Sequence, residues 1–289
     1  MSAAPRGKGR RVASIALGAA ALPPVASALP FWLRLPENVS TYGGTIDGLF
    51  NLILWITGAI FVLVEVLLLF FLFRYRRREG RPAHYTHGSN RLEVIWTIVT
   101  AVIFIGLAVM GQSVWASLHF NQAPPGAFQI EVVAQQFQWN FHYAGRDGVF
   151  GRTDPNLIDD SALNFIGLDE ADPNAKDDTT HSVIAIPEGR PVELILRSRD
   201  VIHNFWVPQL RFKQDLVPGM VIRVHFTANR PGKYELACAE LCGQLHFKMR
   251  SNMLVLPAAE HAELMGLPQD QFQTRIGELL NKYPLPPNN

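Results

Sequence analysis

The stretch Cys238-Ala239-Glu240-Leu241-Cys242-Gly243-Gln244-Leu245-His246-Phe247-Lys248-Met249 contains the only two cysteines of the chain, followed at short spacing by an imidazole and a thioether. Thiolate, imidazole and thioether are soft to borderline ligands, which select copper over hard cations such as magnesium or calcium. Three residues separate the two thiolates, so both can bridge a pair of metal ions held close together. The stretch therefore predicts a copper site.

A disulfide is the alternative, because two cysteines in an exported domain are most often paired. The presence of His246 and Met249 in the same loop argues against it. A second imidazole, His203, lies in the run from Ser198 to Pro208, which has strand character. Alone, His203 would be read as a core histidine. Together with the loop it completes a set of two thiolates, two imidazoles and one thioether.

Three segments together resemble subunit II of the haem-copper cytochrome c oxidases: Asp200-Val201-Ile202-His203 through Val207-Pro208, Lys213 to Gly219, and Cys238-x3-Cys242-x3-His246-x2-Met249. The resemblance implies a binuclear CuA centre, with both cysteines bridging two coppers and His203 and His246 each binding one. It implies that Met249 and the backbone carbonyl of Glu240 are weak outer ligands. The side chain of Glu240 would also bind a Mg²⁺ or Mn²⁺ ion shared with subunit I.

The N-terminus reads as a secretory signal peptide over residues 1–28. Basic residues precede a short apolar run from Val12 to Leu22, and Ala26-Ser27-Ala28 follows. The run is too short to cross a bilayer, which needs about 20 apolar residues. The alternative is an uncleaved tail. Residues 29–45 are then an exported N-terminal segment.

Two longer apolar runs, residues 46–73 and 94–118, predict transmembrane helices. The loop between them, residues 74–93, carries six arginines: Arg74, Arg76, Arg77, Arg78, Arg81 and Arg91. The positive-inside rule places this loop in the cytoplasm and the C-terminal half on the opposite face. The sequence thus predicts a bacterial-type inner (cytoplasmic) membrane protein with its copper domain on the periplasmic side.

Two acidic residues lie in or beside the predicted spans. Glu65 lies inside the first span, where an ionisable group is costly. We expect it to stay protonated or to pair with a neighbouring subunit. Glu93 lies at the cytoplasmic mouth of the second span, where the helix dipole favours an acid. The resemblance implies that Glu93 is at the entrance of a proton-uptake path into subunit I, although the proline that commonly follows in the family's motif is absent here.

The exported domain, residues 125–257, contains short alternating segments bounded by Pro, Gly and Asn, which predict an all-β sandwich or barrel. One such segment runs from Phe128 to Tyr143. The resemblance narrows the fold to a membrane-anchored all-β protein, in which a two-helix transmembrane hairpin precedes a cupredoxin-like Greek-key β-barrel. Residues 258–289 form a C-terminal helix and tail.

Two features predict where electrons and their donor meet the domain. Phe137 and Trp139 lie two residues apart, which on one strand places them on the same face. We expect one of them, Trp139 in preference to Phe137, to be an exposed ring over the metal through which electrons enter. Eight acids between Asp154 and Asp178 would by default form a solvated face, but beside a copper centre they would attract a basic cytochrome c.

The resemblance implies electron transfer from cytochrome c to a haem in subunit I, where oxygen reduction drives proton pumping. No Cys-x-x-Cys-His occurs, so the donor is a separate soluble or membrane-bound cytochrome c. The partners implied are subunit I, other oxidase subunits and the lipid bilayer, and no basic stripe with aromatics indicates nucleic acid. The alternatives are a quinol oxidase subunit, a nitrous oxide reductase domain and a membrane-anchored copper carrier without an electron-transfer role.

Overall fold

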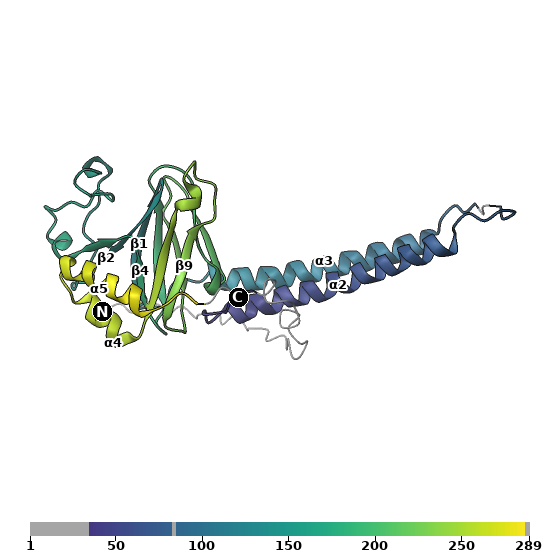
Figure 1. Ribbon diagram of the computed structural model, residues 1–289, viewed down its shortest axis with the longest axis horizontal. Coiled ribbons are helices and arrows are strands. Elements are labelled where there is room, and N and C mark those ends of the chain that lie inside the picture. Colours follow the sequence, from purple (N-terminus) through teal and green to yellow (C-terminus); the bar gives the residue numbers. More distant parts are fainter. Residues whose placement is uncertain (1–34, 83–84, 287–289) are drawn as a thin grey trace, which may run out of the picture.

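The computed structural model of the chain describes residues 35–82 and 85–286. A helical hairpin projects from a β domain, and two C-terminal helices lie on the side of that domain remote from the hairpin (Figure 1). The predicted signal peptide falls outside the described residues.

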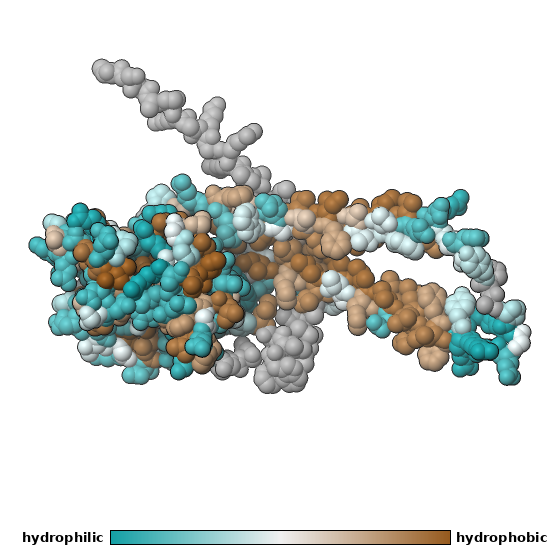
Figure 2. Space-filling view, turned by 90° about the horizontal axis from the view of Figure 1, so that it is seen from above, coloured by the Kyte–Doolittle hydropathy of each residue, from teal (hydrophilic) through white to brown (hydrophobic). Residues whose placement is uncertain are grey.

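The hairpin consists of α2 (Gly43–Arg74) and α3 (Asn90–His119). Both helices are long and apolar enough to cross a membrane, and apolar residues cover most of their length in Figure 2. Each helix extends beyond the predicted span, since residues flanking the apolar run continue the same turns. At the base of α2, the Arg211 guanidinium pairs with Asp47 at 2.7 Å. This ion pair attaches the hairpin to the β domain.

Ten strands form the β domain in two five-stranded sheets, ordered β3-β2-β1-β5-β8 and β4-β10-β9-β6-β7. The strands are β1 (Phe128–Gln135), β2 (Gln138–Tyr143), β3 (Thr179–His181), β4 (Ile184–Pro187), β5 (Val192–Ser198), β6 (His203–Val207), β7 (Phe212–Leu216), β8 (Ile222–Phe226), β9 (Gly232–Cys238) and β10 (Arg250–Leu256). The predicted barrel thus takes the form of two packed sheets with the cupredoxin-like arrangement.

The first predicted segment, Phe128 to Tyr143, is not one strand. It is an antiparallel hairpin in which Gln135 pairs with Gln138 across a turn at Gln136 and Phe137. Its apolar residues still alternate toward the core, where Val132 and Phe141 are fully buried. Gln136 and Phe137 form the turn at the end of this hairpin and not part of a strand, so their side chains need not follow the alternation of the strand residues.

The C-terminal segment forms two helices, α4 (Ala258–Met265) and α5 (Gln269–Lys282), where the sequence predicted one. Pro268 lies between them, and proline cannot continue a helix interior. On α5, Phe272, Ile276 and Leu279 are buried at the spacing of one helical face. These side chains extend the hydrophobic core of the β domain.

A buried charged cluster anchors the long segment between β2 and β3. His142 lies between two carboxylates: its Nδ1 is 3.0 Å from Glu131 and its Nε2 is 2.6 Å from Asp178. Arg197 pairs with the other oxygen of Glu131 at 2.8 Å. Asp178 also accepts hydrogen bonds from the backbone N–H groups of Gly145 and Gly151. Both ends of the inserted segment are thereby fixed to the sheet.

The cluster should make stability depend on pH in both directions. Burial opposes ionisation of all three groups, but their hydrogen bonds and charges prevail, so the pKa of His142 is raised and those of Glu131 and Asp178 are lowered. The carboxylates stabilise the fold above their unfolded pKa values of about 4, and protonated His142 does so below about 6.5. We expect the melting temperature of the metal-free chain to peak between these values. It should fall on the alkaline side as His142 deprotonates, and His142→Gln should flatten that side of the profile.

Candidate metal centre

Two strand ends and one loop build the site. His203 is the first residue of β6, Cys238 is the last residue of β9, and residues 239–249 form the metal loop that leads to β10. Two backbone hydrogen bonds close this loop: Cys238 N–H donates to Met249 at 3.0 Å, and Ala239 N–H donates to Asn204 at 3.1 Å. The second bond ties the loop to β6 beside His203.

The two thiols are free, buried and adjacent. Their Sγ atoms lie 4.0 Å apart. His203 Nδ1 is 3.9 Å from the Cys238 sulfur, and His246 Nδ1 is 3.5 Å from the Cys242 sulfur. Each thiol therefore has its own imidazole, which comes from β6 in one case and from the metal loop in the other.

The two weaker ligands predicted by resemblance also lie at the thiols. Met249 Sδ is 3.7 Å from the Cys242 sulfur, and the Glu240 carbonyl oxygen is 3.2 Å from the Cys238 sulfur. Met249 is buried, whereas the Glu240 side chain is exposed at the surface of the loop. All six predicted ligand residues thus meet in one place.

The donor set fits a soft metal. The nearest ligand atoms of His203, Cys238 and Cys242 all lie within 4.8 Å of one another. A metal–thiolate bond is about 2.3 Å long, so two sulfurs 4.0 Å apart can share an ion. Burial opposes ionisation of Cys238, but hydrogen bonding with His203 lowers its pKa. Burial and the neighbouring Cys238 thiolate raise the pKa of Cys242. A cation between the two sulfurs would offset this repulsion.

Asp200 orients the first imidazole. Its Oδ1 is 2.8 Å from His203 Nε2, and its Oδ2 accepts the backbone N–H of Gln136 at 2.7 Å. Because Nε2 is occupied, Nδ1 is the nitrogen that faces the thiols. A carboxylate on the outer nitrogen of a metal-binding histidine is a common way to fix its ring. Asp200 therefore links the imidazole of β6 to the turn between β1 and β2.

Gln136 supports the metal loop, and the sequence did not single it out. Its Nε2 donates to the Cys242 carbonyl at 2.5 Å. A Cβ placed on Gly243 would lie 2.8 Å from that same nitrogen and 3.0 Å from the Phe137 ring. Gly243 also has a φ of +138°, which favours glycine. The glycine that follows Cys242 was the signal in the sequence that another segment approaches the loop closely.

Gly243→Ala is expected to weaken copper binding by about tenfold or more, the scale of losing an outer-shell contact. The added methyl would push the β1–β2 turn away from the Cys242 carbonyl. Gly219→Ala is the matched control, because Gly219 also has positive φ (+76°) but no atom within 4 Å of the added Cβ. Copper titration of both variants separates backbone strain from close approach. Equal losses would show that the contact with Gln136 is irrelevant.

The expectation that Trp139 is an exposed ring is wrong. Trp139 is 1% exposed, and its ring packs edge-on against Phe205 and His203. The turn at Gln136 and Phe137 is the reason: Trp139 is on β2, opposite Ala134, and points into the core. Phe137, in the turn, remains half-buried and lies against Gly243 of the metal loop. The two rings do not share a face.

Most of the acidic run is occupied within its own segment. Six carboxylates accept hydrogen bonds from backbone N–H groups: Asp154, Asp159, Asp169, Asp172, Asp177 and Asp178. Asp160 pairs with Arg199 at 2.8 Å, beside Asp200. These carboxylates therefore form helix caps and turns, and Glu170 is an exposed acid for which the described residues give no partner.

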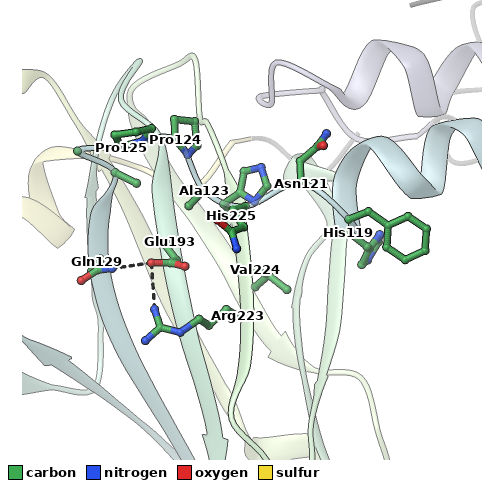
Figure 3. A pocket seen from close by; sticks show the side chains of 14 residues that line it. His119, Asn121, Ala123, Pro124, Pro125, Gln129, Glu193, Arg223, Val224 and His225 are labelled. Atoms are coloured by element: carbon green, nitrogen blue, oxygen red, sulfur yellow. Dashed lines mark hydrogen bonds and ion pairs between the residues drawn. The ribbon is translucent and has the colours of Figure 1, made fainter. Parts of the chain in front are cut away.

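Two other histidines, His119 and His225, lie in a cavity apart from the thiols. This polar cavity of about 570 Å³ lies where α3 joins the β domain (Figure 3). Glu193 in this cavity accepts from Gln129 at 2.6 Å and from Arg223 at 3.2 Å. None of the six predicted ligand residues lines it.

Comparison with known proteins accounts for both halves of the chain. The family model described as cytochrome C oxidase subunit II, periplasmic domain, matches residues 128–256, and that of the transmembrane domain matches residues 28–114. The alternative cytochrome c oxidase subunit 2 of Bradyrhizobium diazoefficiens is 37% identical over 228 residues, covering 78% of this chain and 80% of the relative. The chain belongs to the cytochrome c oxidase subunit II family.

Other members of the subunit II family are similar to this chain over different lengths. Cytochrome c oxidase subunit 2 of Thermostichus vulcanus is 29% identical, covering 80% of this chain and 79% of the relative. The crystal structure of the periplasmic domain of subunit II from Bradyrhizobium japonicum is 22% identical with a TM-score of 0.37, covering 52% of this chain and 99% of that one. With the two apolar helices, the family assignment means that this subunit II is membrane-anchored, with its β domain outside the bilayer.

Proposed function

We propose that this subunit II holds a binuclear CuA centre and takes electrons one at a time from cytochrome c for a terminal oxidase. One observation carries the proposal: two free, buried thiols 4.0 Å apart are met by two imidazoles and a thioether. Copper held by these residues would supply one-electron redox chemistry, and the buried, hydrogen-bonded donor set would limit rearrangement when the charge changes.

The residues of the chain would hold this centre rigid. Cys238 and Cys242 would bridge, His203 and His246 would each bind one copper, and Asp200 would keep the His203 ring in place. The Glu240 carbonyl and Met249 would complete the set. Burial of both thiols excludes water, which limits reorganisation around the site.

We further propose that electrons arrive through Phe137. Its half-buried ring lies against the residue that follows Cys242, whereas Trp139 is enclosed. Trp139 packs against the His203 ring and would instead help to hold that ring in place. The donor would be a separate cytochrome c.

Phe137→Ala is expected to slow electron uptake from reduced cytochrome c by about tenfold, equivalent to about 1.4 kcal/mol in the barrier. Its copper spectrum should stay unchanged, because the ring lies against Gly243, which has no side chain to bind a metal. Stopped-flow reduction of the centre measures the rate. Leu163→Ala is a control, since Leu163 is a 71% exposed apolar residue of the acidic segment. An equal loss in both variants would contradict a special role for Phe137.

The membrane arrangement follows from the same proposal. The arginine-rich loop would lie in the cytoplasm, the β domain on the periplasmic side of a bacterial inner membrane, and subunit I beside the helices. Glu93, in the first turn of α3, would stand at the mouth of a proton-uptake path. Glu240, whose side chain is exposed, would share a Mg²⁺ or Mn²⁺ ion with subunit I.

Oxygen consumption by membranes that carry the complete oxidase tests this role. Reduced cytochrome c should support respiration with the native chain, and His203→Ala should abolish it while the haem-bearing subunit remains present. Respiration with quinol but not with cytochrome c would assign the chain to a quinol oxidase. Unchanged respiration in the variant would refute the role of the site.

A further inference from the structure

Glu65 is the only ionisable side chain between Gly48 and Phe73 of α2. Arg74 ends the apolar run, and nine residues at 1.5 Å each place Glu65 about 13.5 Å from it along the helix. The hydrocarbon core of a bilayer is about 30 Å thick, so Glu65 lies near its mid-plane. An ionisable group at this depth almost always faces protein or a water-filled cavity.

The neighbouring helix α3 does not supply a partner. In this part of α2 the least exposed apolar side chains, Ile60 (44%) and Leu67 (42%), mark the side turned toward α3. Glu65 follows Ile60 by five residues, which rotates it by about 140° from that side. Among residues 35–82 and 85–286, no side chain bonds to Glu65. Its carboxyl therefore points away from the hairpin.

Glu65 lies in the middle of an ordered stripe. We define the Glu65 stripe as residues spaced alternately by four and three positions: Gly58, Val62, Glu65, Leu69 and Leu72. Such spacing forms one seam along which a second helix packs. Val62 and Leu72 are each 59% exposed, more than the side facing α3. A Cβ on Gly58 would meet nothing within 4 Å, so a neighbouring backbone can approach there.

We propose that the Glu65 stripe packs against a transmembrane helix of the haem-bearing oxidase subunit, and that this helix donates a hydrogen bond to Glu65. The partner's identity rests on the proposed function. Acyl chains offer no donor to a carboxyl at this depth. A symmetric pair of this chain would place two identical carboxyls at one seam, which disfavours the ionised form of both. A different helix with its own donor satisfies the group.

Cross-linking in native membranes tests the contact. A light-activated amino acid replaces Val62 or Leu69 in the full chain, because thiol reagents would attack the two metal-site cysteines. Leu63 is the matched control: it precedes Glu65 by two residues, at the same depth and about 160° around the helix. Val62 and Leu69 should link to the haem-bearing subunit several-fold more than Leu63. Links only to lipid, or to a second copy of this chain, would overturn the proposal.

Two substitutions test the hydrogen bond. Glu65→Leu should lower the haem subunit that co-purifies with the chain by about threefold to tenfold, the scale of one interhelical hydrogen bond. Glu65→Gln should retain assembly, because the amide oxygen still accepts. Assembly of Glu65→Leu at the native level would overturn the proposal. If the native chain co-purifies with no haem protein, the proposed function itself fails. If the native chain does co-purify with a haem protein but the Glu65 stripe does not cross-link to it, only this inference fails.

Discussion

A chain carrying Cys242→Ser is expected to lose the two-copper centre. The Cys242 sulfur lies 3.5 Å from His246 Nδ1 and 3.7 Å from Met249 Sδ, so it is the shared neighbour of half the ligand set. A serine hydroxyl is a hard ligand that stays protonated and cannot bridge soft metal ions. Copper content should fall to one ion per chain or fewer. Electron uptake should fall by more than about 100-fold, the upper range for losing an outer-shell partner.

Cys238→Ser should have the same consequence, because the proposal assigns both thiols to both metals. Leu241→Ala is the matched control within the metal loop: Leu241 is 78% exposed and contributes no ligand atom. Metal analysis and optical spectra of the three purified variants decide the matter. A serine variant that keeps two coppers and a spectrum shared between them would show that the thiols do not bridge.

Asp178→Ala is expected to cause the largest loss of stability outside the metal site. Asp178 is 5% exposed, and its carboxylate contacts His142 and two backbone N–H groups. Removing one partner of a buried ion pair costs about 3 to 5 kcal/mol. His142 would keep Glu131, so we expect a loss near the lower figure, to which the two N–H groups of Gly145 and Gly151 contribute because they lose their acceptor. For a domain of this size the melting temperature should drop by about 10 °C or more. Thermal unfolding of the purified chain followed by circular dichroism measures it.

Glu170→Ala is the control for this effect, since Glu170 lies in the same acidic segment but is exposed. Its melting temperature should stay close to that of the native chain, as for most surface substitutions. Loss of Asp178 should also expose the inserted segment to proteases, because that carboxylate holds the N–H groups at its start. A drop no larger than that of Glu170→Ala would show that the cluster does not anchor the segment.

The residues that the structure brings together at the thiols could be predicted from the sequence, because most of them lie in one loop. Cys238, Cys242, His246 and Met249 are close in sequence, so only His203 had to be brought from elsewhere. The two helices could also be predicted from the sequence, since a long apolar run that ends in arginines is typical of a membrane span. The predicted ends of the two spans therefore lie within a few residues of the ends of α2 and α3 in the structure.

The failures concern residues whose role depends on a turn. A run of alternating aromatic residues predicts a face, but it does not indicate that the chain reverses at Gln136 and Phe137. That reversal buries Trp139 and brings Gln136 to the Cys242 carbonyl. Likewise, eight acids in one segment suggest a charged surface, whereas Asx caps and the His142 cluster use most of them internally. Tertiary contacts decided both outcomes.

Copper content and electron paramagnetic resonance of the purified full chain test the central claim most directly. After loading with Cu(II) under conditions that keep thiols reduced, the proposed centre predicts two coppers per chain, a purple colour and hyperfine structure shared equally over both ions. A single-copper signal would contradict it. So would a colourless chain that binds Cu(I) alone, as a copper carrier would, or one in which Cys238 and Cys242 have formed a disulfide.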